Sequence, residues 1–138
     1  MKILIIDGQG GRLGRLLAEK IKSEPCLEGA QLYAVGTNSI ATAAMLKSGA
    51  DHGATGENPA IVISRDADYI IGPVGILCAD ALLGEVTEAM AAAIGRSPAK
   101  KILIPVNRCG ILVAGVSDMG LSELAAEAVK LISKGEDL

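Results

Sequence analysis

The first fourteen residues place an apolar run, a glycine-rich turn and the beginning of an amphipathic pattern in immediate succession. Residues 3–6 are all isoleucine or leucine, and four of the residues in 7–14 are glycine. Apolar side chains then recur at helical spacing, at Leu13, Leu16, Leu17 and Ile21. This order predicts a buried strand, a tight turn and an amphipathic helix, which together open a β-α-β unit.

The same alternation of apolar strands and helical patterns continues along the chain. Further strands are predicted at residues 31–35, 49–54, 67–71, 101–105 and 111–115, and further helices at residues 39–47, 57–65, 85–95 and 121–134. The apolar residues 76–83 fit either a helix or a strand. Continuous apolar strands that alternate with helices are typical of a parallel sheet covered by helices on both faces.

The connection between the last two predicted strands is too short for a crossover helix, so residues 111–115 are expected to pair antiparallel with residues 101–105. We therefore expect one α/β domain over residues 1–138, with a three-layer, Rossmann-like architecture. Its sheet should contain about six strands in the order 3-2-1-4-5-6, all parallel except the last.

Composition and charge exclude several classes of protein. The chain of 138 residues has a net charge of −3 and neither tryptophan nor phenylalanine, so it lacks the basic surface and stacking residues of nucleic-acid binding. No apolar stretch approaches the roughly 18 residues of a membrane span, and the start has no signal-peptide layout. The three cysteines form no Cys-x-x-Cys pair for a metal or redox site. We expect a cytoplasmic protein without a nucleic-acid or membrane partner.

The glycine turn predicts a phosphate site. Gly8, Gly11 and Gly14 follow a Gly-x-x-Gly-x-x-Gly spacing, with Gly10 as an extra glycine. In a strand–turn–helix unit the free N–H groups at the helix start face a phosphate. The predicted cofactor-binding residues of this turn are Gly8, Gln9, Gly10, Gly11, Arg12, Leu13 and Gly14.

Two other interpretations of the turn were weighed. The first is a tight strand–helix connection without a ligand, in which Asp7, an unfavourable neighbour for a phosphate, caps or braces the loop. The second is the phosphate loop of nucleotide triphosphatases, which needs a lysine and a hydroxyl residue directly after its last glycine. Arg15 and Leu16 follow Gly14 instead, which argues against that second interpretation.

The end of the second predicted strand bears on which dinucleotide binds. An NAD site usually carries an acid there for the ribose hydroxyls, whereas this chain has Thr37 and Asn38. A hydroxyl and an amide beside Arg12 suit a 2′-phosphate, so NADP is favoured over NAD. Gly72 and Pro73 follow the fourth strand and are expected either to cover the ribose–phosphate or to form a rigid turn.

No complete catalytic set is predicted. The Tyr-x-x-x-Lys pair of short-chain dehydrogenases is absent. His52 is expected near the rim of the site, and Arg108 and Cys109 follow the fifth strand on the same edge. Asp80 fits a buried helix cap as well as a functional acid.

Three roles therefore remain open. They are a nucleotide-binding protein, a small reductase whose active site forms at a subunit interface around Arg108, Cys109 and His52, and a non-catalytic interaction protein that retains the fold. The apolar residues 76–83 are expected to be exposed, which makes a homo-oligomer the expected assembly.

Six motifs together resemble a family of short bacterial proteins that is described only as a domain of unknown function. These motifs are residues 6–11, 36–38, 54–58, 72–75, 82–85 and 107–109. The resemblance implies a cytoplasmic, Rossmann-like protein and brings no established activity or catalytic residues. The glycine loop separately resembles the NAD(P)-binding superfamily, and its spacing is similar to that of the extended and atypical short-chain dehydrogenases.

Overall fold

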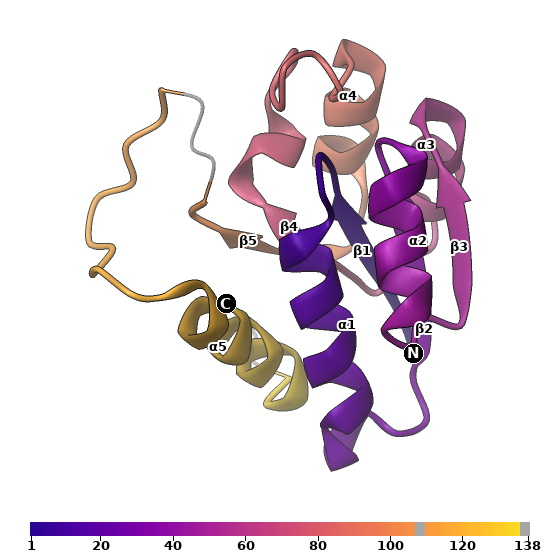
Figure 1. Cartoon of the computed structure of the whole chain (residues 1–138), viewed down its shortest axis with the longest axis vertical. Helices are drawn as coiled ribbons and strands as arrows, with labels where there is room; N and C mark the ends of the chain where they lie inside the picture. Colours follow the sequence, from indigo (N-terminus) through magenta and orange to yellow (C-terminus); the bar gives the residue numbers. More distant parts are fainter. Residues whose placement is uncertain (107–109, 136–138) are drawn as a thin grey trace.

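The computed structural model describes residues 1–106 and 110–135, and these form an α/β fold around a five-stranded parallel sheet. The strands are β1 (Lys2–Asp7), β2 (Gln31–Gly36), β3 (His52–Thr55), β4 (Tyr69–Pro73) and β5 (Lys100–Ile104). Their order in the sheet is β3-β2-β1-β4-β5, so β1 lies at the centre (Figure 1). Asp7 pairs with Gly36 in the register, which brings the carboxyl ends of β1 and β2 to the same edge.

Two groups of helices cover the two faces of the sheet (Figure 1). One face packs against α1 (Arg12–Ser23), α2 (Ser39–Lys47) and α5 (Leu121–Ser133). The other packs against α3 (Glu57–Ser64), the 3₁₀ turn η2 (Val74–Leu77) and α4 (Glu88–Arg96), and a second 3₁₀ turn, η1 (Pro25–Leu27), follows α1.

The central strand supplies apolar side chains to both faces. Ile3 and Ile5 belong to the cluster beneath α1, whereas Leu4 and Ile6 belong to the cluster beneath α4. Successive side chains of a strand point to opposite faces. The uninterrupted apolar run at the start of the sequence is therefore explained by burial on both sides.

The predicted sixth strand is wrong. Residues 110–120 contain no strand and form an exposed connection between β5 and α5, which stands away from the sheet in Figure 1. An apolar run forms a strand only where a partner strand and a packing surface are available, and the Leu112 side chain is 90% exposed. The connection instead carries the chain to α5, which packs beside α1.

Residues 76–83 also differ from the expectation. The segment forms the end of η2 and a series of turns, and Ile76 and Leu82 are buried against the sheet. Leu83, at 96% exposure, is the exception among its large side chains. The homo-oligomer therefore stays a prediction, and Leu112, Val113 and Val116 are further exposed apolar side chains.

The replacement Leu112→Ala tests whether residues 110–120 form an exposed connection and not a buried strand. It is expected to change the free energy of unfolding by less than about 0.5 kcal/mol, because the side chain is already in water. The matched variant Leu32→Ala removes a fully buried side chain of β2 and should cost about 3 kcal/mol. Urea unfolding measures both variants, and equal losses would contradict the exposed connection.

Among the residues that the structure describes, no helix combines the length and the apolar character needed to cross a membrane.

Candidate functional site

The glycine turn joins β1 to α1 at the carboxyl edge of the sheet, and a cleft of about 320 Å³ lies beside it. The described residues that line this cleft are Asp7, Gly8, Gln9, Gly10, Gly11, Arg12, Leu13, Val106 and Leu121. Six of the seven turn residues predicted to bind a cofactor therefore share one cleft, and Gly14 lies outside its lining. In doubly wound sheets this edge is where ligands bind.

Three backbone N–H groups of the turn have no acceptor within the described residues. The N–H of Gly11 donates to the Gly8 carbonyl at 2.9 Å, and the N–H groups of Gly8 and Gly14 donate to Asp7. Those of Gly10, Arg12 and Leu13 make no such bond in the described part of the chain. Arg12 and Leu13 open helix α1, where the helix dipole adds partial positive charge.

Asp7 braces the turn from its buried side, as one interpretation of the sequence predicted. Its carboxylate accepts the N–H of Gly8 at 2.8 Å and that of Gly14 at 2.7 Å, and the residue is only 5% exposed. Burial raises the pKa of Asp7, the hydrogen bonds from Gly14 and Gly8 oppose that rise, and the charge of Glu85 adds to it. Asp7 thus occupies one N–H group of the first helical turn and leaves those of Arg12 and Leu13 open.

Three of the four turn glycines are required for packing. A Cβ atom added to Gly8 would lie 2.4 Å from Thr37 Oγ1, and one added to Gly14 would lie 2.5 Å from the sulfur of Met45. At Gly11 the φ angle is +72° and an added Cβ would lie 2.8 Å from the Cα atom of Ala41. The glycine spacing is therefore explained without a ligand.

Gly10 differs from the other three glycines. A Cβ atom added there would have no neighbour within 4 Å, although the residue lines the cleft. This glycine is the one whose missing side chain leaves open space beside the unpaired N–H groups.

An acid that the sequence did not reveal lies at the ends of β1 and β2. Glu85 precedes α4, and its carboxylate accepts hydrogen bonds from the Gln9 N–H, the Thr37 hydroxyl at 2.8 Å and the Asn38 amide. Burial raises the pKa of Glu85, but the hydrogen bonds from Asn38, Thr37 and Gln9 outweigh it and hold the pKa below its ordinary value. The carboxylate is therefore ionised at neutral pH.

The side chains expected to hold a 2′-phosphate are engaged with this carboxylate. The Asn38 amide also donates to the Gln9 carbonyl at 2.8 Å, and its oxygen accepts the Ala41 N–H as the N-cap of α2. Thr37 donates its hydroxyl to Glu85. Two of the three residues on which the preference for NADP depended, Thr37 and Asn38, thus already use their donors beside a negative charge, whereas the third, Arg12, is exposed.

The loop that carries Glu85 has an unusual backbone. Asp80, Leu82 and Leu83 have φ angles of 66°, 56° and 58°, in the left-handed region that leucine rarely adopts. Such residues cost about 1 to 3 kcal/mol each and concentrate at functional sites. Hydrogen bonds between the backbones of Asp80 and Val86 (2.7 Å) and of Val86 and Ala81 (3.1 Å) hold the loop together.

A family model described as a domain of unknown function, DUF3842, matches residues 2–136. The chain belongs to this family. None of the curated proteins compared with it matches the chain. Among solved structures, a dodecameric FMN-dependent UbiX-like decarboxylase from Escherichia coli O157:H7 is similar at 14% identity and a TM-score of 0.47, covering 100% of this chain and 96% of that one. This likeness is too distant to bear on the ligand or activity of the DUF3842 protein.

The remaining predicted residues are not brought to the cleft of this DUF3842 member. Gly72 and Pro73 are buried in β4, and an added Cβ at Gly72 would lie 2.3 Å from the Ile6 carbonyl oxygen, so this glycine permits close strand packing. Neither is among the described residues that line the cleft. Asp80 is exposed in its loop, and the N-cap of α4 is Thr87, so Asp80 is not a buried helix cap.

His52 lies away from the rim. It opens β3 at the amino end of that strand, where its ring packs on Tyr33 with 4.6 Å between centroids and contacts Gln31 at 3.2 Å. The prediction near the rim failed because β3 begins three residues later than expected. Asn107, Arg108 and Cys109 lie outside the described residues and follow Val106, which lines the cleft.

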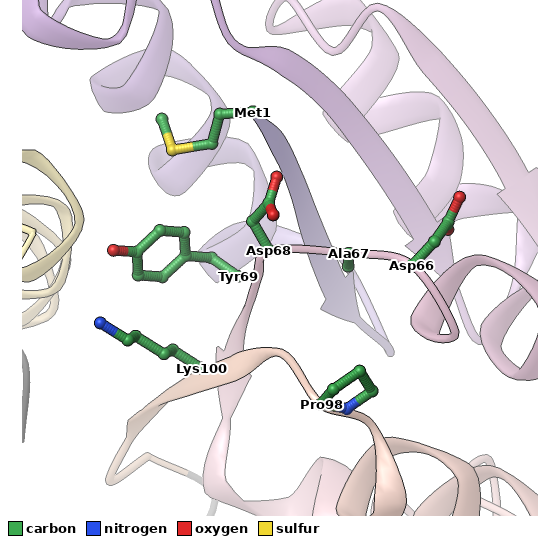
Figure 2. A pocket seen from close by; sticks show the side chains of 7 residues that line it. All are labelled: Met1, Asp66, Ala67, Asp68, Tyr69, Pro98 and Lys100. Atoms are coloured by element: carbon green, nitrogen blue, oxygen red, sulfur yellow. The ribbon is translucent and has the colours of Figure 1, made fainter.

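A larger hollow of about 760 Å³ lies at the opposite, amino end of the sheet. Its lining includes Asp66, Asp68 and Tyr69, and Figure 2 shows their side chains. Asp68 accepts the backbone N–H of Lys2 at 2.7 Å, and Asp66 pairs with the Lys2 ammonium, so both acids have structural roles. Within the described residues no group of histidine, cysteine and acidic side chains fits a metal ion.

Proposed function

We propose that this protein binds a phosphate-bearing nucleotide cofactor in the cleft beside Gly10. The observation that carries the proposal is the set of three N–H groups, from Gly10, Arg12 and Leu13, that lack acceptors among the described residues while their residues line one cleft. Leu13 is buried, whereas Gly10 and Arg12 are exposed, so a ligand can reach this group of donors from solvent. A phosphate at a helix N-terminus pairs several such N–H groups at once. The exposed Arg12 adds a full positive charge at the same place.

The geometry does not favour NADP within this class of ligands. The sequence supported NADP through Thr37 and Asn38 beside Arg12 and through the absence of an acid after the second strand. In the structure both side chains bond to Glu85, which supplies an acid at that position in space. A dinucleotide with an unsubstituted ribose is therefore the better candidate, and NADP is the weaker one.

Binding without an assigned reaction is the extent of this proposal. The reductase alternative places its active site at a subunit interface around Arg108, Cys109 and His52, and no observation in the described residues favours it. Within one chain His52 lies at the amino end of β3, away from the edge that holds the cleft. The interaction-protein alternative is favoured by one observation, the exposed apolar side chains of Leu112, Val113 and Val116, of which Leu112 is 90% exposed. The ligand measurement described next separates that alternative from the nucleotide proposal.

The variant Gly10→Glu tests the phosphate site. A carboxylate at this position repels a phosphate and competes for the open N–H groups, whereas the fold has room for the side chain. Isothermal titration with NADH, NADPH, FMN and ATP should show binding to the native protein for at least one of them. Gly10→Glu should weaken that binding by about tenfold or more, which corresponds to about 1.4 kcal/mol.

Two controls accompany this experiment. Gly10→Gln adds a side chain of the same size without the charge and should weaken binding much less. Adenosine and riboflavin lack phosphate and should bind far more weakly than their phosphorylated counterparts. Equal binding to native protein and Gly10→Glu would contradict the proposed site, and no binding of any nucleotide at millimolar concentration would favour the interaction protein.

A further inference from the structure

The carboxylate of Glu85 has unequal hydrogen bonding at its two oxygens. Oε1 accepts from the Thr37 hydroxyl at 2.8 Å, from the Asn38 amide, and from the Gln9 N–H at 3.2 Å. Oε2 accepts only the Gln9 N–H, at 3.1 Å, among the described residues. Glu85 is partly exposed, so Oε2 retains lone pairs that a group from solvent or from a ligand can reach.

The chemistry of that oxygen restricts what can bind to it. An ionised carboxylate accepts hydrogen bonds and donates none, so its partner must be a donor such as a hydroxyl group. A phosphate, which is negatively charged, is repelled from the same place.

Glu85 is not itself among the described residues that line the cleft, but Gln9, which lines it, connects this acceptor to the proposed phosphate site. The Gln9 N–H points to Glu85, and the N–H of the next residue, Gly10, is one of the three open donors at the cleft. An anion site and a hydroxyl acceptor are thus separated by one residue of backbone. A ribose that carries both a phosphate and free hydroxyls has this combination of groups.

We propose that Glu85 is a specificity-determining residue that accepts a hydrogen bond from a ribose 2′- or 3′-hydroxyl of the bound nucleotide and excludes a 2′-phosphate. The inference rests on the proposed function, because it needs a nucleotide in the cleft. It also goes beyond it, since it assigns the choice between ribose forms to a side chain from the loop before α4. The hydrogen bonds from Gln9, Thr37 and Asn38 hold this acid at the ends of β1 and β2.

The test compares the affinities of NADH and NADPH for the native protein and for Glu85→Gln. The native protein should bind NADH about tenfold or more tightly than NADPH. Glu85→Gln removes the charge and should bring the ratio of the two dissociation constants close to one, with NADH weakened and NADPH strengthened. Glu88→Gln removes an exposed charge of α4 nearby in the sequence and should leave the ratio unchanged.

Two further measurements keep the result interpretable if Glu85→Gln disturbs its loop. Glu85→Asp retains the charge and should still exclude NADPH. For the native protein, NADH analogues whose adenosine ribose lacks the 2′- or the 3′-hydroxyl test the same contact without any substitution, and at least one of them should bind several-fold more weakly than NADH.

The failures of the two proposals are distinguishable. An unchanged NADH to NADPH ratio in Glu85→Gln, with Gly10→Glu still weakening both ligands, would overturn the role of Glu85 and leave the phosphate site standing. Tighter binding of NADPH than of NADH by the native protein would overturn it as well. Absence of binding by either nucleotide would overturn the role of Glu85 in selecting a dinucleotide, and the titrations with FMN and ATP then decide the phosphate site separately.

Discussion

Replacement of Gly11 by alanine is expected to lower the free energy of unfolding by about 3 to 4 kcal/mol. Two effects combine. The φ angle of +72° puts an alanine in the left-handed region, at about 1 to 2 kcal/mol, and its Cβ would lie 2.8 Å from the backbone of Ala41 in α2, which adds overpacking strain. Because the contact is with backbone, a side-chain rotation cannot relieve it.

The neighbouring Gly10→Ala is the matched control for this prediction. Its φ angle is not positive and its added methyl group meets open space, so its stability should lie within about 0.5 kcal/mol of the native protein. Urea unfolding at neutral pH measures both variants. Similar losses in the two would mean that the turn does not pack against α2 as described.

Removal of the Asp7 carboxylate is expected to cost about 3 kcal/mol. Asp7→Ala leaves the N–H groups of Gly8 and Gly14 without their acceptor in a buried place, and each unsatisfied donor costs about 1 to 3 kcal/mol. The loss of a buried charge offsets part of that cost. Thermal or urea unfolding gives the value, and a loss below about 1 kcal/mol would show that water replaces the carboxylate.

The buried Asp7 should also affect how the free energy of unfolding changes with pH. Because burial raises its pKa above the ordinary value of 3.8, the native state holds this proton to a higher pH than the unfolded state does. Its favourable contribution is complete below the ordinary pKa and declines as the pH rises through the raised native pKa. The stability of the native protein relative to Asp7→Asn should therefore fall over that interval, and a rise instead would contradict the buried carboxyl.

The contribution of Glu85 to stability changes with pH in the opposite direction and would otherwise obscure the effect of Asp7. Its pKa is lowered, so its contribution is present above its ordinary pKa and is lost as the pH falls through the lowered native value. Asp7→Asn retains Glu85, so the comparison between the two proteins removes most of its effect.

Elements with strong local patterns were predicted well from the sequence. Helix α2 begins and ends at the predicted residues, 39 and 47, and α5 begins at Leu121 as expected. The order of the first five strands was correct because short α-helical crossovers leave few topologies open. The prediction of a sixth strand is wrong because burial of the apolar residues 111–115 depends on packing partners, which a local pattern does not reveal.

The candidate site was predicted in part for a similar reason. The turn residues from Gly8 to Leu13 were found because strand, turn and helix are contiguous in the sequence. Glu85 was missed because 47 residues separate it from Asn38, and no local spacing connects them. The local signals at Glu85 are the Leu-Leu-Gly-Glu motif of the family resemblance and its place at the end of an apolar stretch, and neither indicates which residues the acid contacts.

The apolar residues of the central strand β1 do not by themselves fix its register in the sheet, but the polar residues at its two ends do. Four consecutive aliphatic residues suit either face equally well, so a slip by one position would hardly change how much apolar surface β1 buries. The polar residues at its ends distinguish the alignments: Lys2 is held by Asp66 and Asp68, and Asp7 holds Gly8 and Gly14. A shifted strand would break both sets of contacts. Lys2 and Asp7 therefore fix the register of β1, and Asp7 also holds the start of α1 at the edge of the sheet.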